Sequence, residues 1–293
     1  MPSGRFAPSP TGPLHLGNLR TALLSWLYAR YDGSPFAMRM EDLDPGASRP
    51  AVVAGQLADL AAIGIDWDGP VVYQSQRRAL YTEALDYLVG HGHTYPCFCS
   101  RREVRDAVLA PQGPDAARRY PGTCRDLASD QIAEYLAAGR RPARRFKASG
   151  VTASFDDRVA GPFRGAADDV VVCRGDGTAA YNLAVVVDDA AMGVELVVRG
   201  DDLLPVTPSQ IEIGRALGTP PVEYAHVPLL RGPDGERLAK RHGAITLAER
   251  LALGGTAGAV IAELAASTGL CAITDRPTPT ELVHEFAARQ RRR

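Results

Sequence analysis

The segment Arg5-Phe-Ala-Pro-Ser-Pro-Thr-Gly-Pro-Leu-His15-Leu-Gly-Asn18 decides how the N-terminal half of the chain is organised. Its pattern predicts a short strand, a turn rich in proline and glycine, and then a helix with one apolar face, formed by Leu19, Leu23, Trp26 and Leu27. The first N–H groups of a helix are unpaired and lie at the positive end of its dipole. A histidine there predicts an anion site, against the alternative of an ordinary strand–loop–helix joint.

The composition is that of a folded, nearly neutral protein. The 293 residues are 45% hydrophobic and carry a formal net charge of −1. This length allows one large domain or a domain with insertions, and the hydrophobic content excludes a disordered chain. The net charge does not indicate a nucleic-acid partner, and the basic cluster at 289–293 is typical of a solvated terminus. No apolar run reaches the roughly 18 residues of a membrane span, so we expect no membrane segment.

Strand and helix patterns alternate after the opening segment. Strands are predicted at 35–40, 170–173 and 195–198, and helices at 49–63, 76–89 and 207–217, which favours a parallel, layered α/β sheet. We also expect strands at 181–187 and 227–230, and a hairpin turn at Asp176-Gly177. The last fifty or so residues read as mostly helical, with two capping boxes, Thr246/Glu249 and Thr278/Glu281.

The segment 95–165 has a different character. It contains three of the five cysteines, many arginines, a loop broken by proline and glycine at 111–122, and a single helix pattern at 129–138. We interpret it as an inserted subdomain rather than a continuation of the sheet. The predicted domains are a split catalytic domain at 1–94 and 166–245, the insertion at 95–165, and a helical C-terminal extension at 246–293.

A second stretch, Gly235-Glu-Arg237-Leu-Ala-Lys240-Arg241, is a basic loop that follows an apolar run. The ammonium group of a mobile lysine suits a phosphate whose charge grows during a reaction. Paired with His15 at a helix mouth, Lys240 would flank a triphosphate from two sides. Each stretch alone is more typical of a solvated loop, so the prediction depends on the pair.

These stretches resemble the motifs of class I aminoacyl-tRNA synthetases. His15-Leu-Gly-Asn18 resembles the HIGH motif and Arg237-Leu-Ala-Lys240-Arg241 the KMSKS motif. The glutamyl branch is indicated by the segments at 5–12, 40–44, 181–189 and 198–203. The chain ends where glutamyl-tRNA synthetases begin an anticodon-binding region, and it carries a cysteine pattern, so it resembles most closely the truncated paralogues called glutamyl-Q tRNA(Asp) synthetases. That resemblance implies a Rossmann-like parallel-sheet catalytic domain, a zinc-bearing insertion, a helical C-terminal part and no anticodon-binding domain.

The resemblance also implies roles for the matching residues. The expected L-glutamate ligands are two arginine clamps, one carboxylate for the α-ammonium and two hydroxyls: Arg5, Arg199, Glu41, Tyr181 and Ser9. The expected ATP ligands are His15, Gly17, Asn18 and Lys240, with His15 and Lys240 as the catalytic pair. Without the resemblance, an internal ion pair would be the simpler explanation for Arg199 and Glu41.

The implied reaction is ATP-dependent, tRNA-independent activation of L-glutamate, followed by transfer to queuosine at the wobble position of tRNA(Asp). The attacking carboxylate is already ionised at neutral pH, so positioning and charge neutralisation by His15, Lys240 and the Mg²⁺ of ATP should supply most of the rate. Two alternatives are a short glutamyl-tRNA synthetase that charges a tRNA 3′ end and a non-catalytic nucleotide- or tRNA-binding module. Arg237 and Ala239 replace the first lysine and the serine of KMSKS, and Asn18 replaces the last histidine of HIGH. A monomer is the family expectation.

The cysteines predict a metal site. Five cysteines and no recognisable signal peptide favour reduced thiols or metal ligands in a cytoplasmic protein. Cys97-Phe-Cys99 and Cys124 could surround one tetrahedral Zn²⁺, with a structural role if the site is closed. Tyr120 is the fourth ligand by resemblance only. Water as the fourth ligand, or three buried thiols without a metal, are the alternatives.

Overall fold

The computed structural model describes residues 3–44, 46, 48–100, 102–104, 119–148, 150–232, 234–235, 238, 245–272 and 274–292. The first half contains β1 (Ser3–Phe6), α1 (Leu16–Tyr31), β2 (Phe36–Met40), α2 (Pro50–Ala62), β3 (Val72–Tyr73), the 3₁₀ helix η1 (Gln74–Gln76), α3 (Arg78–Gly90), β4 (Thr94–Cys97), α5 (Ser129–Ala137) and β5 (Ala143–Phe146). The second half contains β6 (Thr152–Asp157), β7 (Gly161–Ala166), β8 (Val171–Cys173), α6 (Tyr181–Ala191), β9 (Val194–Gly200), the 3₁₀ helix η3 (Asp201–Val206), α7 (Thr207–Leu217), β10 (Glu223–Val227), α8 (Leu247–Ala252), α9 (Ala257–Ala266) and α10 (Pro279–Gln290).

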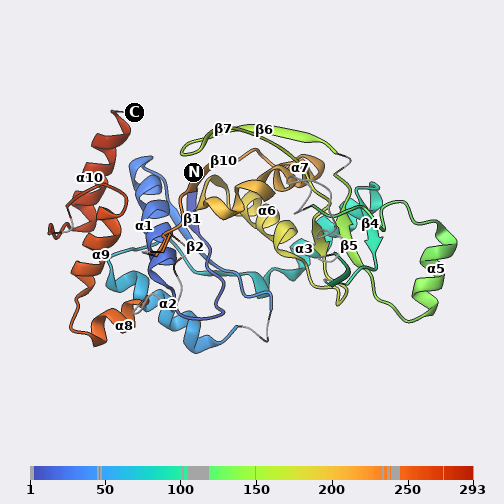
Figure 1. Ribbon diagram of the computed structural model, residues 1–293, viewed down its shortest axis with the longest axis horizontal. Helices are drawn as coiled ribbons and strands as arrows, with labels where there is room; N and C mark the ends of the chain where they lie inside the picture. The colour runs from blue at the N-terminus through green and yellow to red at the C-terminus, as the bar shows by residue number, and fades with distance from the viewer. Residues whose placement is uncertain are drawn as a thin grey trace.

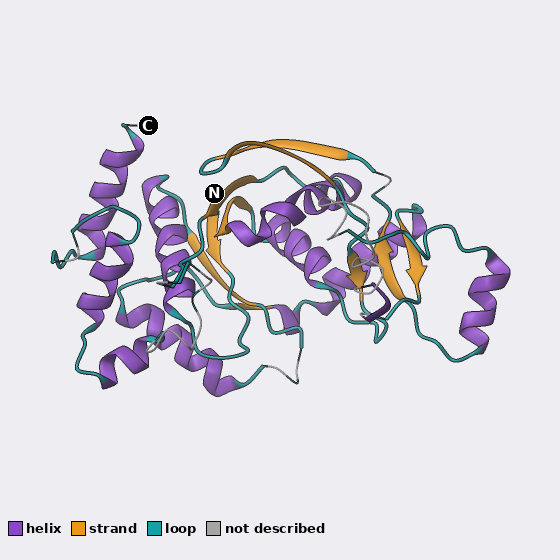
Figure 2. Cartoon of the chain, viewed as in Figure 1, coloured by secondary structure: helices purple, strands orange, loops and turns teal. Residues whose placement is uncertain are grey.

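A seven-stranded sheet lies at the centre of the molecule, in the order β3-β2-β1-β9-β10-β6-β7 (Figure 2). Its neighbouring strands are parallel except for the β6–β7 hairpin at one edge. The chain runs outward from β1 to β3 and later places β9 and β10 on the other side of β1. The strand order therefore reverses between β1 and β9, where sheets of this kind bind ligands at the carboxyl ends of the strands. The predicted parallel α/β fold is confirmed.

A separate, three-stranded antiparallel sheet, β4-β5-β8, lies beside the large sheet, and α5 projects beyond it (Figures 1 and 2). The expectation that 95–165 does not continue the sheet is wrong for β6 and β7, which join the large sheet through β10. β6 shows no continuous apolar run, because exposed and buried residues alternate along it, and its parallel partner is distant in the sequence. The division into domains stays a prediction.

Helix α1 forms the centre of the core. Eleven of its sixteen residues are buried, so its buried surface extends well beyond the predicted apolar face. Strands β1 and β9 contact one side of α1, and α9 and α10 contact another. Gly4 allows β1 to approach the helix closely, because a Cβ on Gly4 would lie 2.9 Å from the Cβ of Ala29. On the other side the ring of Tyr28 packs edge-on against Phe286.

The segment 181–187, predicted as a strand, belongs to helix α6. A short apolar run does not distinguish a buried strand from a buried helix, and here the buried residues recur one helical turn apart: Leu183, Ala184, Val185, Asp188 and Asp189. The Asp176-Gly177 turn forms, with Gly177 at φ +84°, but it leads into this helix rather than into a second long strand. The helix directs Asp188 and Asp189 towards the large sheet.

One further boundary, at the end of β10, differs from the prediction. The strand expected at 227–230 ends at Val227, because Pro228 has no N–H to continue the ladder. His226 is therefore a residue of β10. Helix α7 spans the predicted residues 207–217. Thr207 is its first helical residue rather than its N-cap, and the Thr207 hydroxyl donates to the carbonyl of Leu203 at 2.9 Å.

The C-terminal part is helical, as predicted. Both capping boxes form, at Thr246/Glu249 and at Thr278/Glu281. In Figure 1, α9 and α10 lie on the side of α1 that faces away from the sheet. Within the described ranges, no helix combines the length and the apolar character needed to cross a membrane.

Candidate functional site

A cavity of about 500 Å³ opens at the carboxyl ends of β1 and β9, beside the first turn of α1. It is lined by every predicted glutamate or ATP ligand that the structure describes: Arg5, Ser9, His15, Gly17, Asn18, Glu41, Tyr181 and Arg199. The site therefore coincides with the reversal of strand order. The structure brings these residues together, and their individual roles stay predictions.

Lys240 lies outside the described residues, together with Arg237 and Ala239. The chain before this basic loop borders the cavity, and the chain after it is hydrogen-bonded to the first turn of α1. Leu229 and Leu230 line the cavity before the loop. After the loop, the carbonyl of Ile245 accepts a hydrogen bond from the N–H of Leu16 at 2.6 Å.

His15 is the N-cap of α1. Its Nδ1 accepts from the N–H of Asn18 at 3.1 Å, and the Asn18 side chain accepts from the N–H of His15 at 3.2 Å. Because Nδ1 accepts, the neutral imidazole carries its proton on Nε2. The ring folds over the first turn only because residue 17 is glycine: a Cβ there would lie 2.9 Å from two ring atoms.

The first turn of α1 is not the open row of N–H groups that the sequence predicts. The N–H of Leu16 donates to Ile245 and that of Asn18 to His15. The expected anion site at the helix mouth is therefore narrower than a full turn of unpaired donors. The His15 imidazole and the adjoining Gly17 line the cavity, and their contact with an anion stays a prediction.

The turn at residues 8–12 is held by two other elements. Gln56 of α2 donates its side-chain N–H groups to the carbonyls of Ser9 at 3.2 Å and Gly12 at 2.7 Å. The N–H of Glu41, which follows β2, donates to the carbonyl of Pro8 at 3.0 Å. The sequence did not single out Gln56, because nothing in its local pattern shows that its helix packs on this turn.

A buried charge network lies behind Arg5 and Glu41. Arg5 donates to both carboxylate oxygens of Asp189, at 3.2 and 3.4 Å, and Arg39 donates to one of them at 2.6 Å. Arg39 also pairs with Glu41 at 3.4 Å. Burial lowers the pKa of Arg39, but Asp189, Glu41 and Asp188 outweigh it and raise that pKa overall. Burial raises the pKa of Glu41, against the lowering effect of Arg39 and Arg5.

Arg199, at the end of β9, is held by neutral acceptors. Its Nε donates to Nε2 of His226 at 3.0 Å, its Nη1 to the amide oxygen of Gln210 at 2.7 Å, and its Nη2 to the hydroxyl of Thr207 at 2.8 Å. It forms no ion pair with any carboxylate of the described residues. The alternative of an ion pair between Arg199 and Glu41 is therefore wrong, since Glu41 pairs with Arg39 instead.

His226 has a carboxylate on its other side. Its Nδ1 lies 2.6 Å from Asp157 at the end of β6, and its backbone N–H donates to the same carboxylate at 3.1 Å. Burial lowers the pKa of His226, and Arg199 lowers it further, against the raising effect of Asp157. The sequence assigned no role to His226, because only the pairing of β9, β10 and β6 places it between Arg199 and Asp157.

Tyr181 and Ser9 present hydroxyl groups at the cavity. Tyr181 begins α6 rather than lying on a strand, and 37% of its surface is exposed. Its hydroxyl makes no hydrogen bond to the described residues, so it can donate to or accept from a ligand. Ser9 is exposed on the turn that Gln56 holds.

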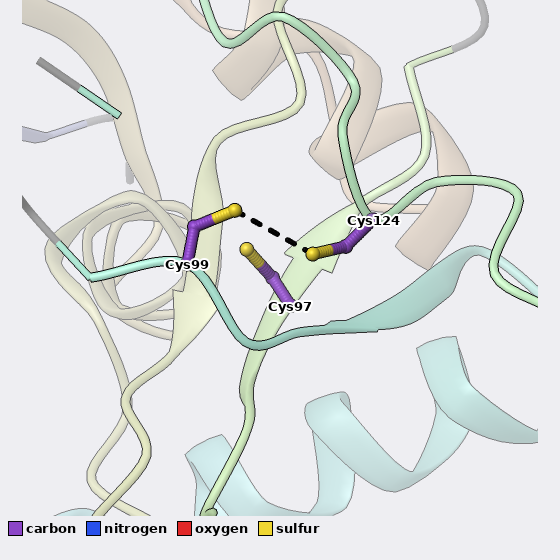
Figure 3. A group of neighbouring side chains, drawn as sticks. All are labelled: Cys97, Cys99 and Cys124. Atoms are coloured by element: carbon purple, nitrogen blue, oxygen red, sulfur yellow. Dashed lines mark hydrogen bonds between the residues drawn. The ribbon is translucent and has the colours of Figure 1, made fainter. Parts of the chain in front are cut away.

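The predicted metal ligands converge in the insertion. The sulfur atoms of Cys97, Cys99 and Cys124 lie within 4.8 Å of one another and point towards a common centre (Figure 3). The Tyr120 hydroxyl lies 3.4 Å from the sulfurs of Cys97 and Cys99, and Cys99 lies 3.5 Å from Cys124. Tetrahedral Zn²⁺ with bonds of about 2.3 Å to sulfur and about 2.0 Å to oxygen separates its ligand atoms by roughly 3.5–3.8 Å. The donor set therefore fits zinc.

Arg145 supports this cluster from outside. Its Nε donates to the sulfur of Cys97 at 3.2 Å, and its guanidinium lies 3.6 Å from the centre of the Tyr120 ring. Burial raises the pKa of Cys97, but its hydrogen bonds with Tyr120 and Arg145 outweigh this and lower the pKa overall. A cation beside a thiolate is the kind of outer partner that stabilises metal-binding cysteines.

Comparison with known proteins agrees with this geometry. Residues 3–255 match the family described as class I tRNA synthetases (E and Q), catalytic domain. The chain is 55% identical to a glutamyl-Q tRNA(Asp) synthetase of Nocardia farcinica, over 97% of this chain and 89% of the relative. It is 48% identical to one of Symbiobacterium thermophilum, over 97% and 91%. A glutamate tRNA ligase from Elizabethkingia meningosepticum, solved in complex with its amino acid, matches with a TM-score of 0.80 and 27% identity. That match covers 96% of this chain and 64% of the ligase. The chain belongs to the glutamyl-Q tRNA(Asp) synthetase family of class I aminoacyl-tRNA synthetases.

Proposed function

We propose that the protein activates L-glutamate with ATP in the absence of tRNA and transfers the glutamyl group to queuosine at the wobble position of tRNA(Asp). The names of its relatives, glutamyl-Q tRNA(Asp) synthetases, support the amino acid and the acceptor. The related glutamate tRNA ligase, solved with its amino acid, supports a glutamate site in this fold.

The observation that carries the proposal is the unequal pairing of the two arginines in the cavity. Arg5 contacts a carboxylate of the protein, Asp189, whereas Arg199 contacts only neutral acceptors. The side-chain carboxylate of glutamate would give Arg199 the direct ion pair that the protein leaves out. The carboxylate of Glu41 would accept the α-ammonium. Glutamine has no charge for Arg199, so this arrangement favours glutamate.

In the activation step, the α-carboxylate attacks the α-phosphorus of ATP, and pyrophosphate leaves. The carboxylate is ionised at neutral pH, so no base has to remove a proton. The Nε2–H of His15, at the mouth of α1, would donate to the phosphates, and Lys240 would stabilise the charge that develops on pyrophosphate. Mg²⁺ bound to ATP supplies further charge neutralisation.

In the transfer step, a hydroxyl of the queuosine cyclopentenediol attacks the carbonyl carbon of the glutamyl-adenylate. A carbon–oxygen ester bond forms, the bond to the AMP phosphate breaks, and the hydroxyl proton is released. Holding both reactants in one cavity makes this step effectively unimolecular.

The test is glutamate-dependent exchange of labelled pyrophosphate into ATP without tRNA, followed by mapping of labelled glutamate on tRNA. We expect exchange without tRNA, its loss in Lys240→Ala, and labelling of tRNA(Asp) only when it carries queuosine. Labelling of the 3′-terminal adenosine would instead identify a short glutamyl-tRNA synthetase. Absence of exchange together with absence of labelling would identify a non-catalytic module.

We also propose that Cys97, Cys99, Tyr120 and Cys124 bind one structural Zn²⁺. The spacing of the four donor atoms supports this, and so does the cation of Arg145 beside Cys97. The ion would tie β4 to the loop before α5, a helix with no buried residue of its own. Zinc would there reinforce the small hydrophobic cluster that contains Tyr95 and Phe98.

A further inference from the structure

We infer that His226, held by Asp157, and Gln210 are positioning residues that set the specificity of the glutamate pocket. They orient the guanidinium of Arg199 through neutral acceptors only, so that its charge is left for the substrate's side-chain carboxylate. This inference rests on the proposed function. It adds three buried residues for which neither the sequence nor the comparisons assign a role.

The protonation state of His226 follows from its two neighbours. The Nε of Arg199 can only donate, so Nε2 of His226, 3.0 Å away, must carry a lone pair. Its proton then lies on Nδ1 and is donated to Asp157 at 2.6 Å. A doubly protonated ring would place two donors against each other. Asp157 thus selects the tautomer, as a carboxylate behind a ligating histidine commonly does.

Asp157 is itself held rigidly. It lies at the end of β6, is 5% exposed, and accepts from the N–H groups of Val159 at 2.9 Å and Ala160 at 2.8 Å. The backbone N–H of His226 adds a further donor. Because Asp157, His226 and Arg199 lie on the adjacent strands β6, β10 and β9, the sheet sets their spacing.

Two other buried arginines, Arg5 and Arg39, are held by a different means. Arg5 and Arg39 both contact the carboxylate of Asp189, and Arg39 also contacts Glu41. Asp157 lies on the other side of the His226 ring from Arg199. The negative charge of Asp157 stabilises the buried guanidinium of Arg199 electrostatically from a distance, and the two groups form no direct ion pair. An imidazole is therefore suited to this position in a way that a carboxylate is not.

Gln210 completes the arrangement and offers an isosteric test. Its amide oxygen accepts from Arg199 at 2.7 Å, its amide nitrogen donates to Asn182 at 3.0 Å, and the residue is 2% exposed. Gln210→Glu keeps the shape but puts a carboxylate directly on Arg199. The Asn182 amide can rotate to donate to the new carboxylate, so this change alters charge more than packing.

The experiment measures pyrophosphate exchange with glutamate and with glutamine, and the KM for ATP, in the full chain. For Gln210→Glu we expect kcat/KM for glutamate to fall at least tenfold. The ratio of kcat/KM for glutamate to kcat/KM for glutamine should also decrease, and the KM for ATP should stay within twofold of wild type. His226→Leu should raise the KM for glutamate by a similar factor. His226→Gln, whose side-chain oxygen can replace Nε2 as a neutral acceptor, should recover most of that loss.

The inference would be overturned if Gln210→Glu left the ratio of kcat/KM for glutamate to kcat/KM for glutamine unchanged. It would also be overturned if His226→Gln and His226→Leu raised the KM for glutamate equally. If Gln210→Glu does not fold, judged by circular dichroism, the two His226 variants decide the matter by the same comparison. If the wild-type protein is active with glutamate, such results would overturn this inference but leave the proposed function standing. A wild-type protein that neither binds nor activates glutamate would overturn both.

Discussion

Asp189→Asn tests the buried charge network behind the cavity. The carboxylate is nearly inaccessible and accepts three hydrogen bonds, two from Arg5 at 3.2 and 3.4 Å and one from Arg39 at 2.6 Å. Asparagine has the same shape but only one acceptor oxygen. If that oxygen keeps the short bond to Arg39, the amide group turns its own N–H donors towards Arg5.

Two effects set the expected magnitude. Removal of one partner of a buried ion pair costs about 3–5 kcal/mol, because the other charge stays buried without compensation. One acceptor is retained and Glu41 still contacts Arg39, so we expect the lower end, about 3 kcal/mol. Against a total stability of about 5–15 kcal/mol, the variant should fold but be clearly weakened.

Urea denaturation followed by circular dichroism measures this loss. The matched control is Glu223→Gln, which also removes a carboxylate that lies 2.7 Å from an arginine, Arg158, but at an exposed position. The control should lose less than about 1 kcal/mol. In exchange assays at a temperature where Asp189→Asn is folded, its KM for glutamate should rise at least tenfold, because Arg5 loses its orientation. A loss of stability no larger than that of the control would refute the reasoning.

Three further outcomes are expected. Burial and Arg199 lower the pKa of His226. The stability that depends on the neutral ring is therefore fully present above about pH 6.5 and declines as the pH falls below that value. Urea denaturation from pH 8 to 5 should show a smaller decline in the free energy of unfolding for His226→Gln than for wild type. Metal analysis should find about one zinc per chain, and Cys124→Ala should lower both the zinc content and the melting temperature; a metal-free wild type of equal stability would exclude the site. Gly17→Ala should displace the His15 ring and cost about 1 kcal/mol of stability. It should also lower kcat for pyrophosphate exchange at least tenfold. An unchanged kcat would show that the ring does not act on ATP.

Much of the local structure could be predicted, because it depends on neighbours in the chain. The start of α1 at His15, the capping boxes of α8 and α10, and the stop of α7 at Gly218 each follow from side chains within one helical turn. The family resemblance, carried by motifs at both ends of the catalytic region, also identified eight of the residues that line the cavity.

The errors arose where a local pattern allows two structures or where a partner is distant. The apolar run at 181–187 is compatible with both a strand and a helix, and burial of one face against the sheet stabilises the helix. The strands β6 and β7 have little apolar signal of their own, and they join the large sheet only because β10 offers an edge.

The sequence by itself therefore determined the class of fold and the identities of the groups that face the cavity. Tertiary structure decided what those groups can do. It gave Arg5 a carboxylate partner and Arg199 only neutral ones. It also placed His226 against Asp157. In each case the partners come from strands and a helix that are far apart in the chain. The reason is physical: the charge that a buried side chain presents to a ligand depends on the acceptors within about 3 Å of it, and only the packed sheet brings those acceptors together.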